Sequence, residues 1–98
     1  MIDIDVRCEA IHGGAWACVV TIDDGDGAPT RHDVTVTTGD LADLAPDATE
    51  PTDLVRRSFA FLLERESKGS ILPRFDLPLI GRYFPEWEAE VARRLPAQ

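Results

Sequence analysis

The length of 98 residues is that of one domain, large enough for a hydrophobic core but small for a core together with a deep substrate cleft. Hydrophobic residues make up 44% of the chain and charged residues 29%, as in ordinary globular proteins, and no apolar run approaches the roughly 18 residues of a membrane-spanning helix. The net charge is −8, and residues 1–50 hold eleven of the 18 acidic residues against two arginines. Such a half repels phosphate backbones, so direct nucleic-acid binding through it is not expected.

The N-terminus bears on the compartment. It alternates acidic and apolar residues, where a secretory signal would have a basic start and an unbroken apolar run. Lys68 is the only lysine among ten basic residues, a preference for arginine that is typical of a GC-rich bacterial genome. We therefore expect a bacterial protein of the cytoplasm that does not bind membranes.

Three segments of the first half alternate apolar and polar residues with the period of two that indicates a β-strand. They are residues 2–8, Ala15 to Asp23 and Thr30 to Thr38. Gly13-Gly14 separates the first two, and a loop rich in Asp and Gly separates the second from the third. The pattern predicts an antiparallel three-stranded meander with one apolar face.

The register of this meander follows from matching the apolar faces, because a slip of one residue would turn every side chain over. In the first hairpin this rule sets Cys8 opposite Cys18. In the second hairpin it sets Val20 opposite Val34.

A strongly apolar helix is expected after an acidic connection, residues 39–50, that itself has one helical turn at Asp40–Leu44. Thr49 as N-cap and Pro51 in the first turn mark the start of this helix, and Lys68-Gly69 marks its end. Its apolar residues recur at helical spacing over about half of the circumference, so the sheet and a second surface must both cover it. They are Leu54, Val55, Phe59, Leu62 and Leu63.

Two shorter helices are expected at the C-terminal end. Ile71 to Phe75 is predicted to be a packed turn, and Asp76 is expected to cap a short helix from Leu77 to Tyr83. Pro85 then opens a last helix, Glu86 to Leu95. The whole pattern predicts a single α+β domain over residues 1–98: a three-stranded antiparallel meander packed on a main helix, followed by two shorter C-terminal helices, in the order βββααα.

The sequence His12-Gly13-Gly14 is similar to the oxyanion loop of lipases and esterases, in which glycines let backbone N–H groups face a developing negative charge. The nucleophile elbow that accompanies this loop is absent, and Ser58 lies inside the predicted main helix. We interpret the motif as a hairpin turn and expect no catalytic residues.

Asp23, Asp24 and Asp26, interleaved with glycine, have some of the spacing of a calcium loop. The twelfth position counted from Asp24 is Thr35, where such a loop needs a bidentate Glu. We expect a solvated turn, with adventitious binding of a divalent ion as the alternative.

Cys8, His12, Cys18 and His32 provide two thiols and two imidazoles, a common combination at structural zinc sites. They lack a C-x-x-C knuckle, and both cysteines fall on the apolar face of the meander. We expect a buried pair of reduced thiols, close enough to oxidise in air, with zinc as the alternative. No cofactor and no metal are expected.

An aromatic group near the C-terminus is the candidate surface for a partner or a ligand. Hydrophobic core is the default for aromatic residues so closely spaced, and a pocket or partner-binding patch with a charged rim is the alternative. The candidate residues are Phe75, Arg82, Tyr83, Phe84 and Trp87.

The run from Ser58 to Glu88 resembles a family of small uncharacterised bacterial proteins with the pattern SFxFLLERE, ILxxFDLxxIxxYFPE. The matching residues are Phe59-x-Phe61-Leu62-Leu63-Glu64-Arg65-Glu66, Ile71-Leu72, Phe75-Asp76-Leu77 and Tyr83-Phe84-Pro85-Glu86. This resemblance covers about a third of the chain and implies no activity. The order of a strand meander and a helix also resembles the topology of HicB-like antitoxins and double-stranded-RNA-binding domains, although the acidic first half disfavours RNA.

These observations favour a non-catalytic cytoplasmic module that binds a protein partner or associates with itself, because a meander leaves its outer strands with open edges. Two alternatives stay open. One is a small ligand-binding domain or enzyme subunit that uses the aromatic residues of the segment 75–87. The other is a regulator of the antitoxin or immunity type, whose acidic half binds a basic partner.

Overall fold

In the computed structural model, which describes residues 2–94, the first strands are β1 (Asp3–Ile11), β2 (Ala15–Asp23) and β3 (Thr30–Thr37), joined as antiparallel hairpins. Cys8 lies opposite Cys18, so the predicted register of the first hairpin is confirmed. Gly13 and Gly14 both have positive φ, 81° and 68°, in the turn between β1 and β2. A glycine adopts this conformation without the cost that a Cβ would add, and the hairpin turn expected at His12-Gly13-Gly14 is confirmed.

The second hairpin differs from its predicted register. Val20 pairs with His32 and Cys18 pairs with Val34, a shift of two residues. Side chains alternate with a period of two, so this shift keeps the same residues on the apolar face, and matching faces cannot detect it. Asp23 and Asp24 accept hydrogen bonds from the backbone N–H groups of Gly25 and Asp26 and so shape the loop that sets the register.

The predicted three-stranded fold is wrong, because the sheet formed by the described residues has four strands and is mixed. The fourth, β4 (Arg74–Asp76), pairs in parallel with β3 and gives the order β1-β2-β3-β4. Asp33 donates its backbone N–H to the carbonyl of Pro73 at 2.8 Å, and Leu77 donates to the carbonyl of Thr35 at 3.0 Å. A strand of three residues has too few positions to show an alternating pattern, which is why a packed turn was expected here.

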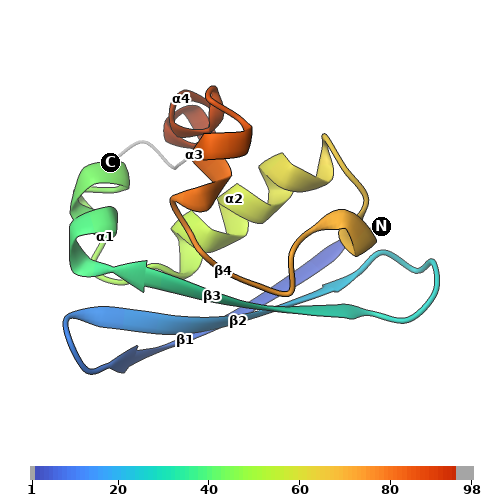
Figure 1. Cartoon of the computed structure of the whole chain (residues 1–98), viewed down its shortest axis with the longest axis horizontal. Helices are drawn as coiled ribbons and strands as arrows, with labels where there is room; N and C mark the ends of the chain where they lie inside the picture. The colour runs from blue at the N-terminus through green and yellow to red at the C-terminus, as the bar shows by residue number, and fades with distance from the viewer. Residues whose placement is uncertain (1, 95–98) are drawn as a thin grey trace.

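Residues 2–94 also contain four α-helices, one more than predicted (Figure 1). The first, α1 (Thr38–Leu44), extends the single expected turn, and Thr37 and Asp40 form a capping box at its start. The main helix, α2 (Thr52–Leu63), is shorter at both ends than the predicted Pro51–Lys68. Thr49 is not its cap; the carboxylate of Glu50 accepts the backbone N–H of Thr52 at 2.8 Å.

The C-terminal helices also differ in their bounds from the prediction. The 3₁₀ turn η1 (Lys68–Ser70) follows α2, and α3 (Leu79–Tyr83) starts after Pro78 because Asp76 belongs to β4 rather than capping a helix. The last helix, α4 (Trp87–Arg94), starts one residue later than expected, and Leu95 lies outside the described residues.

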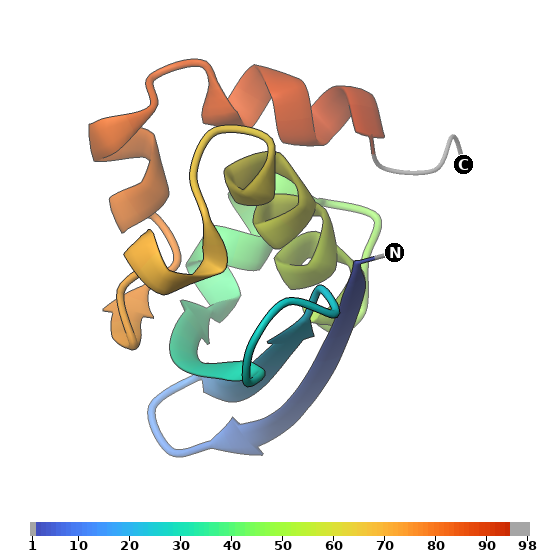
Figure 2. The same cartoon turned by 90° about the vertical axis from the view of Figure 1, so that its right-hand side faces the viewer.

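All four helices lie on one face of the sheet and leave the other face open (Figure 2). The main helix α2 packs on β1 and on α4, which confirms that a second surface covers its wide apolar face. Its side chains Leu54, Val55, Phe59 and Leu62 are buried together with the apolar side chains of the inner strands. Within residues 2–94, no helix combines the length and the apolar character needed to cross a membrane.

Candidate functional site

The candidate site is an apolar groove between the end of α2, the segment 70–75 and α3, with a volume of ≈ 220 Å³. Its floor is formed by buried side chains, and its rim holds two large exposed ones: Leu72, 46% exposed, and Tyr83, 67% exposed. Glu66 is the only charged residue of the lining. The lining residues are Leu62, Glu66, Ser70, Ile71, Leu72, Phe75, Leu79, Ile80, Tyr83 and Phe84.

His32 holds one wall of this groove in place. Its Nδ1 lies 2.8 Å from the carbonyl oxygen of Leu72, and its Nε2 lies 2.9 Å from the hydroxyl of Thr30. A carbonyl can only accept, so Nδ1 is the donor, and in the neutral ring Nε2 accepts from Thr30. The imidazole is buried and its ring centre lies 5.5 Å from that of Phe59, so it links β3, the core and the groove wall.

The other wall depends on how α4 and α3 are attached. Trp87 is 1% exposed, and its Nε1 donates to the hydroxyl of Ser58 at 3.1 Å. Ser58 in turn donates to the carbonyl of Leu54 at 2.8 Å. The side chain of Ser58 is therefore occupied in joining α2 to α4, which gives this buried serine a structural role.

Gly81 lets Trp87 approach the backbone of α3. A Cβ at this position would lie 3.2 Å from the indole ring of Trp87, closer than most Cβ contacts. The indole therefore packs directly on the helix that carries Tyr83.

Arg65 connects the end of α2 to the start of α4. Its guanidinium lies 3.8 Å from the ring centre of Phe61, and its Nε donates to Glu86 at 3.2 Å. A hydrogen bond from the backbone of Glu86, and then the one from Arg65, lowers the pKa of the Glu86 carboxyl below its ordinary value. Phe61 also meets Phe84 edge to face, with ring centres 5.8 Å apart, which orients Phe84 beside the groove.

The structure divides the five residues expected to form a partner or ligand surface. Phe75, Tyr83 and Phe84 line the groove together. Trp87 lies in the core, and Arg82 lies outside the groove, in a separate depression that includes Asp76. The sequence did not predict Leu72 as a residue of this site. The signal that could have indicated it is a leucine next to Pro73 in a segment with neither strand nor helix periodicity.

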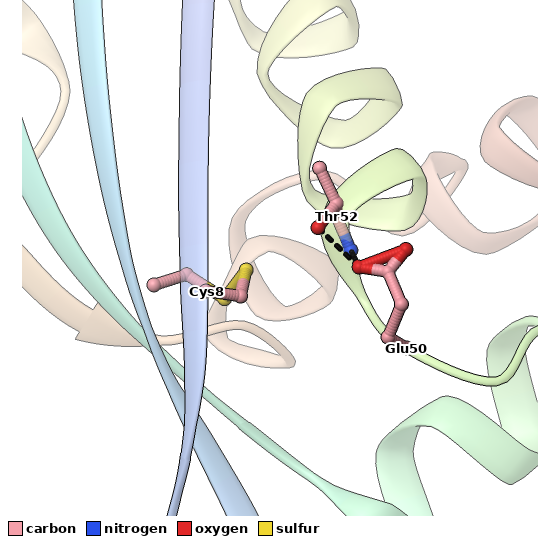
Figure 3. Close-up of a disulfide and its surroundings, with 4 residues drawn as sticks. Cys8, Glu50 and Thr52 are labelled. Atoms are coloured by element: carbon pink, nitrogen blue, oxygen red, sulfur yellow. Dashed lines mark hydrogen bonds between the residues drawn. A yellow bond between two sulfur atoms is a disulfide. The ribbon is translucent and has the colours of Figure 1, made fainter.

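The two cysteines are not the reduced thiols expected from the sequence. Cys8 and Cys18 form a disulfide across the first hairpin, with their Cα atoms 4.0 Å apart. In Figure 3 the side chain of Cys8 points from β1 toward the side on which Glu50 and Thr52 begin α2. The predicted register placed the two sulfur atoms together, but the sequence pattern carries no information on whether they are oxidised.

The residues considered as metal ligands are engaged elsewhere or far apart. His12 is exposed in the hairpin turn, whereas His32 is buried against Thr30 and Leu72. Over residues 2–94, no group of three or more His, Cys, Asp or Glu side chains is placed to hold a metal ion.

The acidic loop between β2 and β3 instead binds a cation from the chain itself. Lys68 donates to the carboxylate of Asp24 and to the carbonyl of Asp26. The hydrogen bond from Lys68, followed by that from the backbone of Asp26, lowers the pKa of the Asp24 carboxyl. Lys68 lies beyond the end of α2, which stops at Leu63.

Comparisons with models of protein families, with curated proteins and with solved structures give no match for this chain.

Proposed function

We propose that this protein is a non-catalytic interaction module whose groove takes apolar side chains from a segment of a partner protein. The observation that carries the proposal is the position of Leu72 and Tyr83. Both are large, apolar in most of their atoms and exposed, and both lie on the rim of the same groove. Adjoining apolar surface of this kind is typical of a binding site.

The size of the groove favours side chains over a whole small molecule. Its volume of ≈ 220 Å³ lies below the range of roughly 300–1,000 Å³ that small-molecule sites usually occupy. One or two apolar side chains of a peptide fit such a space, in the way that anchor residues of a helix or strand enter a partner's groove.

Charge indicates the character of the partner. Glu66 is the only charged residue among the described residues that line the groove. The acidic excess of the chain lies in residues 1–50, whereas residues 51–98, which build the groove, hold eight basic and seven acidic residues. A Lys or Arg beside the apolar anchors of a bound segment can therefore pair with Glu66 itself. A basic partner is also what a regulator of the antitoxin or immunity type would bind.

Selection from a displayed library of random peptides tests the proposal. Enriched peptides should share two apolar anchors with a nearby basic residue, and Tyr83→Ser and Leu72→Ser should each abolish their binding. Ile11→Ser is the matched control, because Ile11 is also a large exposed apolar residue, 44% exposed, but lies on the sheet away from the groove. Enrichment that survives both groove substitutions would refute the assignment of the site.

A small ligand is the second candidate, favoured by the meeting of Phe75, Tyr83 and Phe84 in one groove. A compound that binds only the native state raises the melting temperature. A metabolite screen by thermal shift separates the two functions: a hit whose effect disappears with Tyr83→Ser favours the ligand, and peptide binding without such a hit favours the partner.

The cytoplasmic location stays a prediction, and the disulfide bears on it because disulfides are rare in reducing compartments. Alkylation of thiols in intact cells before lysis gives the oxidation state of Cys8 and Cys18 directly. Two alkylated thiols would agree with the cytoplasm, and a protected pair would contradict it.

A further inference from the structure

The β1 edge of the sheet is open. In the order β1-β2-β3-β4, strand β1 pairs only with β2 among the described residues, and Figure 2 shows it along the free border of the sheet. It is nine residues long, contains no proline and pairs with β2 without interruption. Natural edges are protected by shortening, covering, interruption or charged side chains. Of these devices β1 has only the charges, so its backbone can pair with another strand whose charges match.

The backbone groups that this edge presents can be identified. Cys8 and Cys18 have a Cα separation of 4.0 Å, which is that of a pair without mutual backbone hydrogen bonds. Because such pairs alternate along an antiparallel ladder, the N–H and C=O groups of Ile4, Val6 and Cys8 point away from β2. A bond on the other side of β2 agrees with this assignment. The carbonyl of Gly14, an even-numbered residue like Cys18, accepts the backbone N–H of Thr38, which follows β3.

The side chains that β1 places on the open face of the sheet carry three negative charges and one positive charge. Asp3, Asp5, Arg7 and Glu9 lie on the open face of the sheet, and Arg7 is 84% exposed at its side chain. Arg7 already donates to Asp5 on its own strand at 3.3 Å. An acid and a base two residues apart can meet their counterparts on an identical strand that runs in the opposite direction.

We propose that two copies of this protein form a two-fold symmetric dimer by antiparallel pairing of β1 with β1, centred on Val6. Asp5 of each copy then lies opposite Arg7 of the other. On the face that the helices cover, the exposed Ile2 lies opposite the exposed Ala10, and Val6 lies opposite its own copy.

In this register the attractive pairs of Asp5 with Arg7 lie next to the symmetry axis. A shift of two residues in one direction keeps two attractive pairs, Asp3 with Arg7, but puts Asp5 opposite Asp5 on the axis. A shift in the other direction puts Arg7 opposite Arg7 and Asp5 opposite Glu9, so that every pair is repulsive. Like charges directly opposite each other destabilise a strand pair. In the chosen register the like pairs are Asp3 with Glu9, which lie at the two ends of the paired strands, where water screens them most.

The dimer extends the proposed function without depending on it. The groove takes Phe75 from β4, at the opposite edge of the sheet from β1, so pairing through β1 leaves both grooves accessible. The result is one eight-stranded sheet with two grooves, which binds a partner carrying two suitable segments more tightly than one groove alone does.

Charge complementation between variants tests the dimer. D5R and R7D each bring only like charges opposite each other in a homodimer, so each should weaken self-association at least about tenfold relative to the native chain. An equimolar mixture of D5R with R7D restores opposite charges and should form a heterodimer, and the double variant D5R/R7D should dimerise again. Analytical ultracentrifugation over a range of concentrations measures all four, and circular dichroism checks that each variant is folded.

A native chain that stays monomeric at every concentration would overturn the inference. So would a dimer that neither single variant weakens, because the contact would then lie elsewhere. If a variant fails to fold, hydrogen exchange on the native protein decides: the amides of Ile4, Val6 and Cys8 should become protected as concentration rises, and unchanged exchange at these amides refutes the pairing. Tyr83→Ser should leave the dimer intact, so a failure of the groove proposal and a failure of the dimer are separate results.

Discussion

The strands of the first half, residues 3–37, are joined by a continuous backbone ladder and one disulfide, whereas residues 64–94 are attached to the rest by the short backbone pairing of β4 with β3, by core packing and by single side-chain contacts. The side-chain contacts are His32–Leu72, Trp87–Ser58 and Lys68–Asp24, and the pair Arg65–Glu86 joins two parts of the second region to each other. A ladder spreads its stability over many equivalent bonds, so no one side chain decides it. In the second region one substitution can detach a segment, and the groove, which is built there, depends on each attachment.

Trp87→Ala should have the largest effect on stability. Trp87 is 1% exposed and also bonds to Ser58, so its removal leaves a cavity between α2, α3 and α4. We expect the free energy of unfolding to fall by about 3–5 kcal/mol, measured by urea denaturation. Tyr83→Ala is the matched control on the same segment: its side chain is exposed, and the change should stay within about 0.5 kcal/mol. Equal effects of the two substitutions would mean that Trp87 does not anchor the segment.

Reduction of the disulfide tests the first region. Cys8 and Cys18 are ten residues apart, and the chain-entropy model gives about 2–3 kcal/mol for a loop of this size. The melting temperature should therefore fall when a reductant is added. A variant with both cysteines changed to alanine should have the lower value from the outset and no response to reductant. A native protein that melts identically with and without reductant would show that the ladder alone sets the stability of this region.

His32→Leu should destabilise the protein by about 1–3 kcal/mol, because the carbonyl of Leu72 loses its donor from the buried imidazole while the apolar volume is roughly kept. The loss should be local. Hydrogen exchange should accelerate in residues 71–77, which form the groove wall and β4, and much less in β1 and β2. Thr30→Val removes only the contact to the other ring nitrogen and should have a smaller effect. Uniform acceleration over the whole sheet would mean that His32 acts as a core residue and not as a local attachment.

The same contrast explains what the sequence could predict. Alternation along β1 and β2 is a local signal, and it was sufficient for the strands and for the pairing of Cys8 with Cys18. In the second hairpin a shift of two residues preserves the faces, so only the geometry of the loop between β2 and β3 could decide the register. The fourth strand exists because Asp33 and Thr35 find backbone partners about forty residues later, and no local pattern carries that information.

The groove was predicted in part for the same reason. Phe75, Tyr83 and Phe84 were identified as a group by their spacing, and they do line one groove. Whether an aromatic side chain is core or surface depends on its neighbours in space. Trp87 is buried because Gly81 leaves room for its ring. Leu72 carries its exposed side chain on a backbone that is held at its own carbonyl by His32 and at the carbonyl of Pro73 by Asp33.

The contact between Lys68 and Asp24 should have the smallest effect, and among residues 2–94 it is the ion pair that joins the two regions. The pKa of Asp24 is lowered in the folded chain, first by Lys68, so this carboxylate contributes stability above its ordinary pKa of 3.8 and loses that contribution as the pH falls through the lower folded value. When the melting temperature is measured as a function of pH, it should therefore fall less steeply at acidic pH in Asp24→Asn than in the native chain. Near neutral pH the melting temperatures of the two proteins should respond alike to pH. Added salt should reduce the difference only in part, because salt screens half-buried charges less than exposed ones. Asp26→Asn is the matched control, because Lys68 contacts only the backbone carbonyl of that residue. If both variants change the melting temperature at acidic pH equally, the pH dependence reports the total charge of the loop and not the pairing of Asp24 with Lys68.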